Sequence, residues 1–463
     1  MVRPILHKES VKPIPQGNLG GPIHSGEGEN YMSYTAPALL IWSVLMFFVP
    51  QLVGIKWFAQ ADFPWREAMI LHGIFVSAWM LLMLVALQSM KPLNHRIDDR
   101  WVSFGAVCSP LLTGIGGLLG TGAGTSAGTV IQIAGMFLAD ITALLCLFLI
   151  GRDALRRNSA DEHIIARWGL LFALVAISLS TPLGHLAGAY RDIKATLPFF
   201  HAQTATVGID IHALVERFAG SHSHEAIAGF LGAMVLMAVL QTAARGGKWM
   251  ERLEHVGCML ILLATMAQVA IYQYSAWTGW EPPTLFASGK NGIPLDDLIL
   301  SFLGIGMLIL CPLLWKPSRK ERDGSLKRWK GIAFAILIVS FAVAIIGLGI
   351  FIEFNEGFFG HGEGGAPGVI NAQDYIRGHL VYGFIMIPML FVSLLTLPEL
   401  PDTLLSTVVV FGVIGVAILG ALGLAAWTFM LQPSLLTKAS VAWGFIVVLI
   451  GYLHLRNTGF PKR

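Results

Sequence analysis

Charged side chains are scarce in this chain. Asp, Glu, Lys and Arg make up 13% of its 463 residues, about half of the roughly 25% found in soluble proteins. The mean hydropathy is +0.68, which excludes an ordinary soluble domain. A formal net charge of +3 is too small to predict a nucleic-acid partner. The composition therefore predicts a polytopic membrane protein whose immediate surroundings are a lipid bilayer.

Cysteine is also rare. None of the four cysteines has the spacing of a metal site, and all lie in apolar segments, which predicts a packing role for Cys108, Cys146, Cys258 and Cys311. Residues 1–34 are polar and contain Gly and Pro, so no cleavable signal peptide is expected. We expect residues 1–34 to be a cytoplasmic segment and residues 35–463 to be a single membrane domain.

Long apolar runs dominate the rest of the chain. A bilayer requires about 20 apolar residues per helix, and this predicts an all-α fold with about twelve transmembrane helices. The helices are expected in three four-helix arcs, as pseudo-repeats over about 35–150, 165–315 and 331–456. The predicted helices lie near residues 35–54, 68–88, 102–121, 128–150, 165–188, 223–243, 255–275, 295–314, 331–353, 376–397, 404–428 and 438–455.

The distribution of Lys and Arg predicts the orientation. The termini and the even-numbered connections carry 23 of the 31 basic residues, and cytoplasmic loops are the ones enriched in Lys and Arg. Both termini should therefore be cytoplasmic, in the inner membrane of a cell. The longest loops, around 189–221, 276–294 and 354–375, should then lie outside.

Three histidines recur at intervals of roughly 150 residues, each predicted about one turn inside an apolar run: His72, His224 and His379. Imidazole inside a bilayer is costly without a partner, and iron is a common reason to keep it there. We interpret His72 and His379 as the two axial ligands of one low-spin haem b. The alternative is a pair of packing histidines that hydrogen-bond to each other or to loops.

His224 has several interpretations. It could bind a metal, lie in water at the interface, or belong to a helix start capped by Ser221 or Ser223. Other histidines near the outer loops could meet a haem propionate or a partner, although each alone is more often a solvated loop residue. These are His185, His201, His212 and His361.

Intramembrane acids complete the candidate set. Asp140 lies in the middle of an apolar segment and is either a proton relay or a structural hydrogen-bonding group. Glu353 ends the segment 331–353 and is a second relay candidate. Arg377 lies two residues before His379 and could pair with haem propionates.

These motifs resemble the large subunit of the haem–copper oxidase and nitric oxide reductase superfamily. Leu71-His72-Gly73 is similar to the helix-2 haem site of the oxidases. The stretch Arg377-Gly378-His379 is similar to the reductases' His-Gly-His motif in helix 10. The resemblance implies twelve helices in three arcs, with the low-spin haem held by His72 and His379.

The catalytic ligands of that family are replaced here. Arg377 stands where a ligand of the active-site haem would be, and arginine stays protonated. Gln273 and Tyr274 stand where a His-His pair would hold the second metal, just before Trp277-Thr278-Gly279. The resemblance therefore implies a b-type cytochrome without copper that passes electrons within a respiratory complex. A c-type cytochrome on the outer face, or quinol, is the expected partner.

Two other functions stay open. A working terminal oxidase or nitric oxide reductase would need an atypical metal site, for which His224, Glu225 and Tyr274 are the candidates. A non-redox transporter would also suit repeated helices with buried acids. Haem A synthase, which also has histidines early in four-helix units, is a weaker match because its paired loop cysteines are absent.

Overall fold

The fold is known from a computed structural model. It describes residues 32–52, 65–89, 99–156, 163–242, 247–288, 291–315, 326–347, 379–397, 403–428 and 434–458. These residues belong to one compact unit, Tyr31–Arg463. Most of the predicted segment 1–34 lies outside the described residues, as do Glu353, His361 and Arg377.

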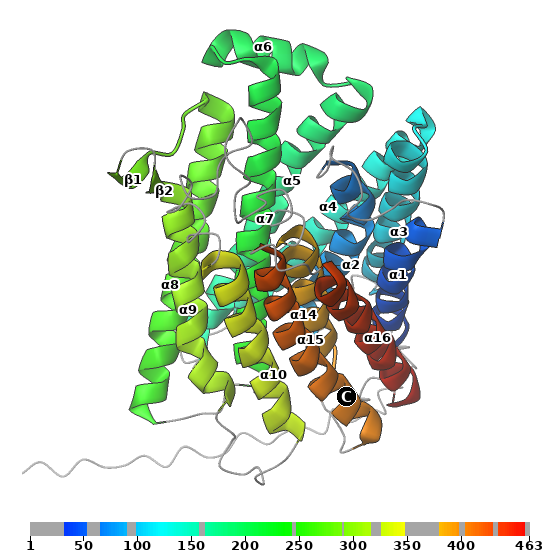
Figure 1. Ribbon diagram of the computed structural model, residues 1–463, viewed down its shortest axis with the longest axis vertical. Helices are drawn as coiled ribbons and strands as arrows, with labels where there is room; N and C mark the ends of the chain where they lie inside the picture. Colours follow the sequence, from blue (N-terminus) through cyan, green and yellow to red (C-terminus); the bar gives the residue numbers. More distant parts are fainter. Residues whose placement is uncertain are drawn as a thin grey trace, which may run out of the picture. The chain divides into compact units, whose positions relative to one another are not determined.

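The described chain is helical apart from one small hairpin (Figure 1). The first helices are α1 (Met32–Leu52), α2 (Trp65–Ser89), α3 (Asp99–Gly117), α4 (Ser126–Arg156), α5 (Ile164–Ile193), α6 (Leu197–Val207), α7 (Ile211–Thr242) and α8 (Lys248–Thr278). After the hairpin of β1 (Thr284–Ser288) and β2 (Asn291–Pro294) come α9 (Leu295–Trp315), α10 (Leu326–Phe341), α14 (Ile387–Leu395), α15 (Leu404–Thr428) and α16 (Ser434–Thr458). Three segments are π-helical: η1 (Leu118–Gly122), η2 (Ala342–Gly347) and η3 (His379–Met386).

The transmembrane prediction holds in its main point. Nine helices of the described chain are long and apolar enough to cross a bilayer, and three shorter apolar helices accompany them. Each of the twelve predicted segments overlaps one of these helices or a π-helical continuation. The chain is thus an all-α, multi-pass membrane protein.

The predicted outer loops contain more structure than expected. The stretch 189–221 holds the end of α5, all of α6 and the first turns of α7, and the stretch 276–294 holds the hairpin. Helix α7 begins at Ile211, twelve residues before the predicted start, because the Asp210 carboxylate caps it. Asp210 Oδ1 accepts from the backbone N–H of His212 at 2.7 Å and of Ala213 at 3.4 Å.

The expectation that His224 opens a helix, with Ser221 or Ser223 as its cap, was therefore wrong. His224 lies thirteen residues into α7. Its Nδ1 atom is 2.8 Å from the carbonyl oxygen of Gly220, one turn earlier. The Ser223 hydroxyl donates to the Ala219 carbonyl within the same helix, as serine does in helix interiors.

The early start of α7 is supported by a separate aromatic cluster. Phe200 of α6 and Phe218 of α7 are fully buried, with ring centroids 5.3 Å apart in an edge-to-face arrangement. Leu214 is also buried in this cluster. The first two turns of α7 thus bury their own apolar face against α6, away from the main core.

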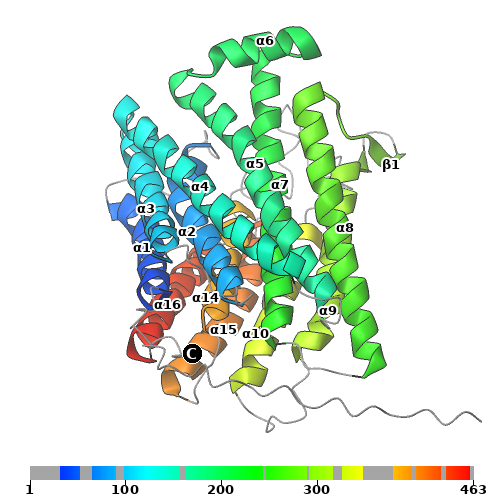
Figure 2. The ribbon, with the colours of Figure 1, turned by 180° about the vertical axis from the view of Figure 1, so that it is seen from behind.

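Helices α2 and α7 form the interior of the bundle. In α2, 89% of the apolar window is buried inside the protein, and in α7 78%, against 39% in α8. Helix α7 contacts α2, α5, α8, α9, α10 and α14, and it lies between α5 and α8 in both views (Figures 1 and 2). The buried polar side chains Ser77, Ser221 and Glu225 on α2 and α7 therefore face other helices.

Candidate functional site

The structure brings three histidines and one acid together from four helices. The rings of His72 on α2 and His222 on α7 have centroids 6.2 Å apart and planes 15° apart. His185 on α5 lies close enough to His72 for an electrostatic interaction. The Nδ1 atom of His185 is 3.4 Å from Oδ2 of Asp140 on α4. We call these four residues the histidine cluster.

A proline, Pro182, lies inside α5 three residues before His185. Pro182 has no N–H, so it cannot bond the carbonyl of Ser178 one turn earlier. The Thr181 hydroxyl donates to that carbonyl instead, at 2.9 Å. Interruptions of this kind commonly kink a helix and turn neighbouring carbonyls outward.

Two carbonyls of this turn accept bonds from other helices. The Ser180 carbonyl is 3.0 Å from Nδ1 of His222, and the Leu179 carbonyl accepts from the Gln273 side-chain amide at 3.0 Å. A carbonyl can only accept, so Nδ1 of His222 carries the proton. A neutral His222 then presents an unprotonated Nε2, the arrangement in which a backbone acceptor orients a ligating histidine.

Glycine at position 184 makes room for the His222 ring. A Cβ atom there would lie 2.7–2.8 Å from three atoms of the imidazole. Any larger residue would push the ring away from its bond to Ser180. The sequence Gly184-His185 thus supplies ring space and one member of the cluster.

A second polar network lies on the α8 side of α7. Glu225 is fully buried, and its Oε2 accepts from Gln273 Nε2 at 3.0 Å. The His224 ring stacks on Tyr272, with centroids 4.9 Å apart. The Tyr272 hydroxyl donates to Asp296 Oδ2 at 2.5 Å. His224 and Glu225 are neighbours in sequence, but His224 contacts Tyr272 whereas Glu225 bonds Gln273.

The atypical metal site proposed for a working reductase is not assembled in the structure. Tyr274 is 57% exposed, whereas Glu225 is fully buried and bonds Gln273. Within the described ranges, no three His, Cys, Asp or Glu side chains are grouped closely enough to hold a metal ion. Haem iron takes only two protein ligands, so this finding does not bear on an axial pair.

The predicted partner of His72 is only partly described. The backbone of His379 begins η3, and nothing of its side chain is described. Helix α14, which continues η3, packs against α2. Arg377 and Glu353 remain predictions outside the described residues.

Two members of the cluster, His185 and His222, were not grouped with His72 from the sequence alone. His185 was treated as a loop histidine, yet it lies in α5 beside Asp140. The predicted candidate was His224, whereas the cluster contains His222, two residues earlier. The combination of Pro182 and Gly184 directly before a histidine in an apolar helix was the available signal.

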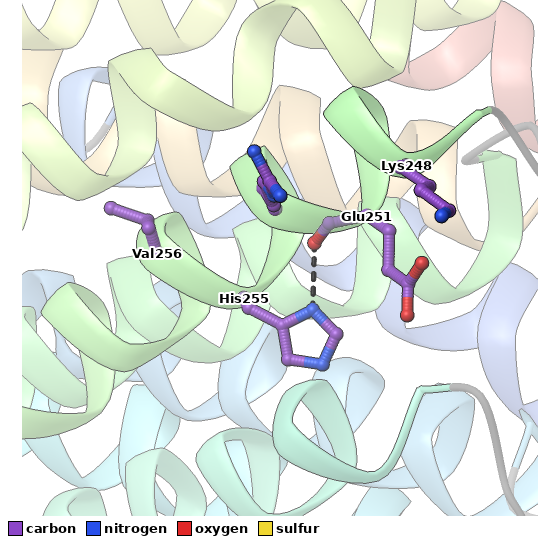
Figure 3. A pocket seen from close by; sticks show the side chains of 5 residues that line it. Lys248, Glu251, His255 and Val256 are labelled. Carbon is purple, nitrogen blue, oxygen red and sulfur yellow. Dashed lines mark hydrogen bonds between the residues drawn. The ribbon is translucent and has the colours of Figure 1, made fainter.

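A further hollow lies at the start of α8 (Figure 3). It is lined by one face of the first turns of this helix: Lys248, Glu251, Arg252, His255 and Val256. Figure 3 shows the His255 ring bonded to the Glu251 carbonyl, at 2.7 Å. His255 thus lies in the first turns of α8 and is not part of the histidine cluster.

No family model, curated protein or solved structure matches this chain. The fold and the site define its class: a multi-pass helical membrane protein with a half-buried cluster of three histidines and one aspartate.

Proposed function

We propose that this protein is a membrane-embedded b-type cytochrome that transfers electrons through one low-spin haem. The observation that carries the proposal is the gathering of His72, His185 and His222 within apolar transmembrane helices. Imidazoles and carboxylates inside a bilayer are costly and usually mark a functional site. His72 and His379 would be the axial ligands, from α2 and η3.

The described residues around His72 fit a bound haem. Trp79 follows His72 by two helical turns, so the two side chains share one face of α2. Its indole is 5% exposed, and Nε1 has no hydrogen-bond acceptor among the described residues. A buried donor without an acceptor is rare in native proteins, and a bound polar group would satisfy it.

The chain itself would hold, orient and shield the group. A haem supplies reversible one-electron chemistry when bound. The enclosed apolar window of α2 excludes water from this face. Asp140, paired with His185, is the proton-relay candidate nearest the site. Arg377 would pair with propionates, and Glu353 is the second relay candidate.

The proposed membrane orientation and partners rest on the sequence. The excess of Lys and Arg at the termini and even-numbered connections supports cytoplasmic termini in a cell inner membrane. The resemblance to the haem–copper oxidase and nitric oxide reductase superfamily supports three helical arcs and a place in a respiratory complex. A c-type cytochrome at the outer face, or quinol, would supply or accept the electrons.

A non-redox transporter is the second candidate. The buried carboxylate of Glu225 favours it, because ionisable groups within the membrane often mark a transport pathway. The two candidates differ in one simple property, the presence of haem.

The test is a haem count on the purified protein. Pyridine haemochrome analysis should give one haem b per chain, and His72→Ala should abolish it. The matched control is His255→Ala at the start of α8, which should keep the full haem content. A wild-type protein purified without haem from haem-replete cells would refute the proposal and favour the transporter.

A further inference from the structure

A polar seam runs between α7, α8 and α9, which all contact one another. Thr265, Gln268 and Tyr272 lie on one face of α8 at helical spacing, and all three are buried. Thr265 faces α7, since a Cβ atom on Gly232 would lie 3.3 Å from its hydroxyl oxygen. Gln268 and Tyr272 face the first turn of α9, where both donate to Asp296.

Three oxygens in this seam lack a hydrogen-bond partner within the described part of the chain. They are Oγ1 of Thr265, Oε1 of Gln268 and Oδ1 of Asp296. The available donors are already used: Gln268 Nε2 bonds the Asp296 carbonyl at 2.6 Å, and the Tyr272 hydroxyl bonds Asp296 Oδ2 at 2.5 Å. Thr265 and Gln268 are each only 1% exposed. Unsatisfied buried oxygens in a native protein point to a water or an ion.

The charge around these oxygens is negative. Asp296 and Asp297 open α9, and Glu225 lies across on α7. His224 is the one basic side chain seen to act on Asp297. Among the ion pairs of the described residues, none joins a Lys or Arg to these three carboxylates. The seam therefore combines spare oxygen acceptors with the carboxylate of Asp296, which favours a cation.

We propose that this seam binds a sodium ion through Asp296, Gln268 and Thr265. Carboxylate, amide and hydroxyl oxygens are ligands for hard cations. A calcium site takes six to eight oxygens, with several carboxylates among them. No three acidic, Cys or His side chains within the described residues are grouped as such a site needs. One carboxylate with neutral oxygens suits a monovalent ion. The site does not depend on the proposed haem.

Thermal unfolding in detergent tests the sodium site. The purified wild-type protein is compared in NaCl, KCl and choline chloride at equal ionic strength. Because a ligand that binds only the folded state stabilises it, NaCl should raise the unfolding midpoint by at least about 2 °C over both other salts. Thr265→Val keeps the side-chain shape but removes the oxygen, and it should abolish the sodium effect.

Thr142→Val is the matched control, because Thr142 is equally buried but lies on α4, outside the seam, and bonds the Leu138 carbonyl. It should keep the full sodium effect. Binding of ²²Na⁺ to the purified protein is the second measurement, with loss expected in Asp296→Asn. Equal midpoints in the three salts, a larger effect of Ca²⁺ than of Na⁺, or unchanged ²²Na⁺ binding in Thr265→Val would overturn the inference.

Discussion

Replacing Gly184 by Ala tests whether α5 positions His222. The new Cβ would lie 2.7 Å from Cδ2 and 2.8 Å from Cγ of the imidazole, well inside van der Waals contact, so the ring must move. Overpacking of this kind costs about 1–3 kcal/mol, and loss of the His222–Ser180 bond costs about 1 kcal/mol more. The higher helix propensity of Ala offsets about 1 kcal/mol of this loss in stability. The net expectation is a loss of about 1–3 kcal/mol in the free energy of unfolding.

The assay is differential scanning fluorimetry of the purified protein in detergent. The control is Gly415→Ala in α15, where nothing lies within 4 Å of the added Cβ, so that only the propensity gain of about 0.5–1 kcal/mol should appear. We expect a lower unfolding midpoint for Gly184→Ala and an unchanged or higher one for Gly415→Ala. Equal midpoints for the two variants would show that the His222 ring is not held against α5.

Three further predictions follow. His185→Phe should leave the half-buried Asp140 carboxylate without its histidine partner and cost about 1–3 kcal/mol in the free energy of unfolding. Adding Asp140→Leu should recover part of this loss, and additive losses in that double-mutant cycle would contradict the pairing. The pKa of Asp210 is lowered by bonds from the backbone N–H groups of His212 and Ala213, so its cap is present above the ordinary carboxyl pKa and is lost as pH falls through the lowered value. The protection of the backbone amides at the start of α7 against hydrogen exchange, corrected for the intrinsic exchange rate at each pH, should therefore fall at low pH. Asp210→Ala should lower this protection even at neutral pH. A reporter fused after Arg463 should be active only in the cytoplasm, and activity confined to the outside would reverse the assigned orientation.

The positions of the transmembrane helices could be predicted because hydrocarbon thickness sets a simple length requirement. Apolar runs such as 68–88 and 404–428 need no knowledge of packing, and both are helical. The start of α7 could not be predicted in this way. Its first turns contain charged residues such as Glu216 and Arg217, which resemble a loop, while their apolar side packs on α6 outside the main core.

The candidate site was only partly predictable for a related reason. His72 and Asp140 stood out individually, because each is polar within an apolar run. Their neighbours depend on how helices pack: His222 meets His72 across α2 and α7, and His185 meets Asp140 across α5 and α4. Such contacts join residues far apart in sequence, and a periodic pattern in one helix does not specify the partner face.

The most direct test of the central claim is the optical spectrum of the purified protein, oxidised and then reduced with dithionite, before and after carbon monoxide. A six-coordinate haem between two histidines has no free iron position. We therefore predict a reduced b-type spectrum that carbon monoxide does not change. A clear carbon monoxide shift would indicate a five-coordinate iron and a terminal reductase, and the absence of any haem spectrum would contradict the cytochrome assignment altogether.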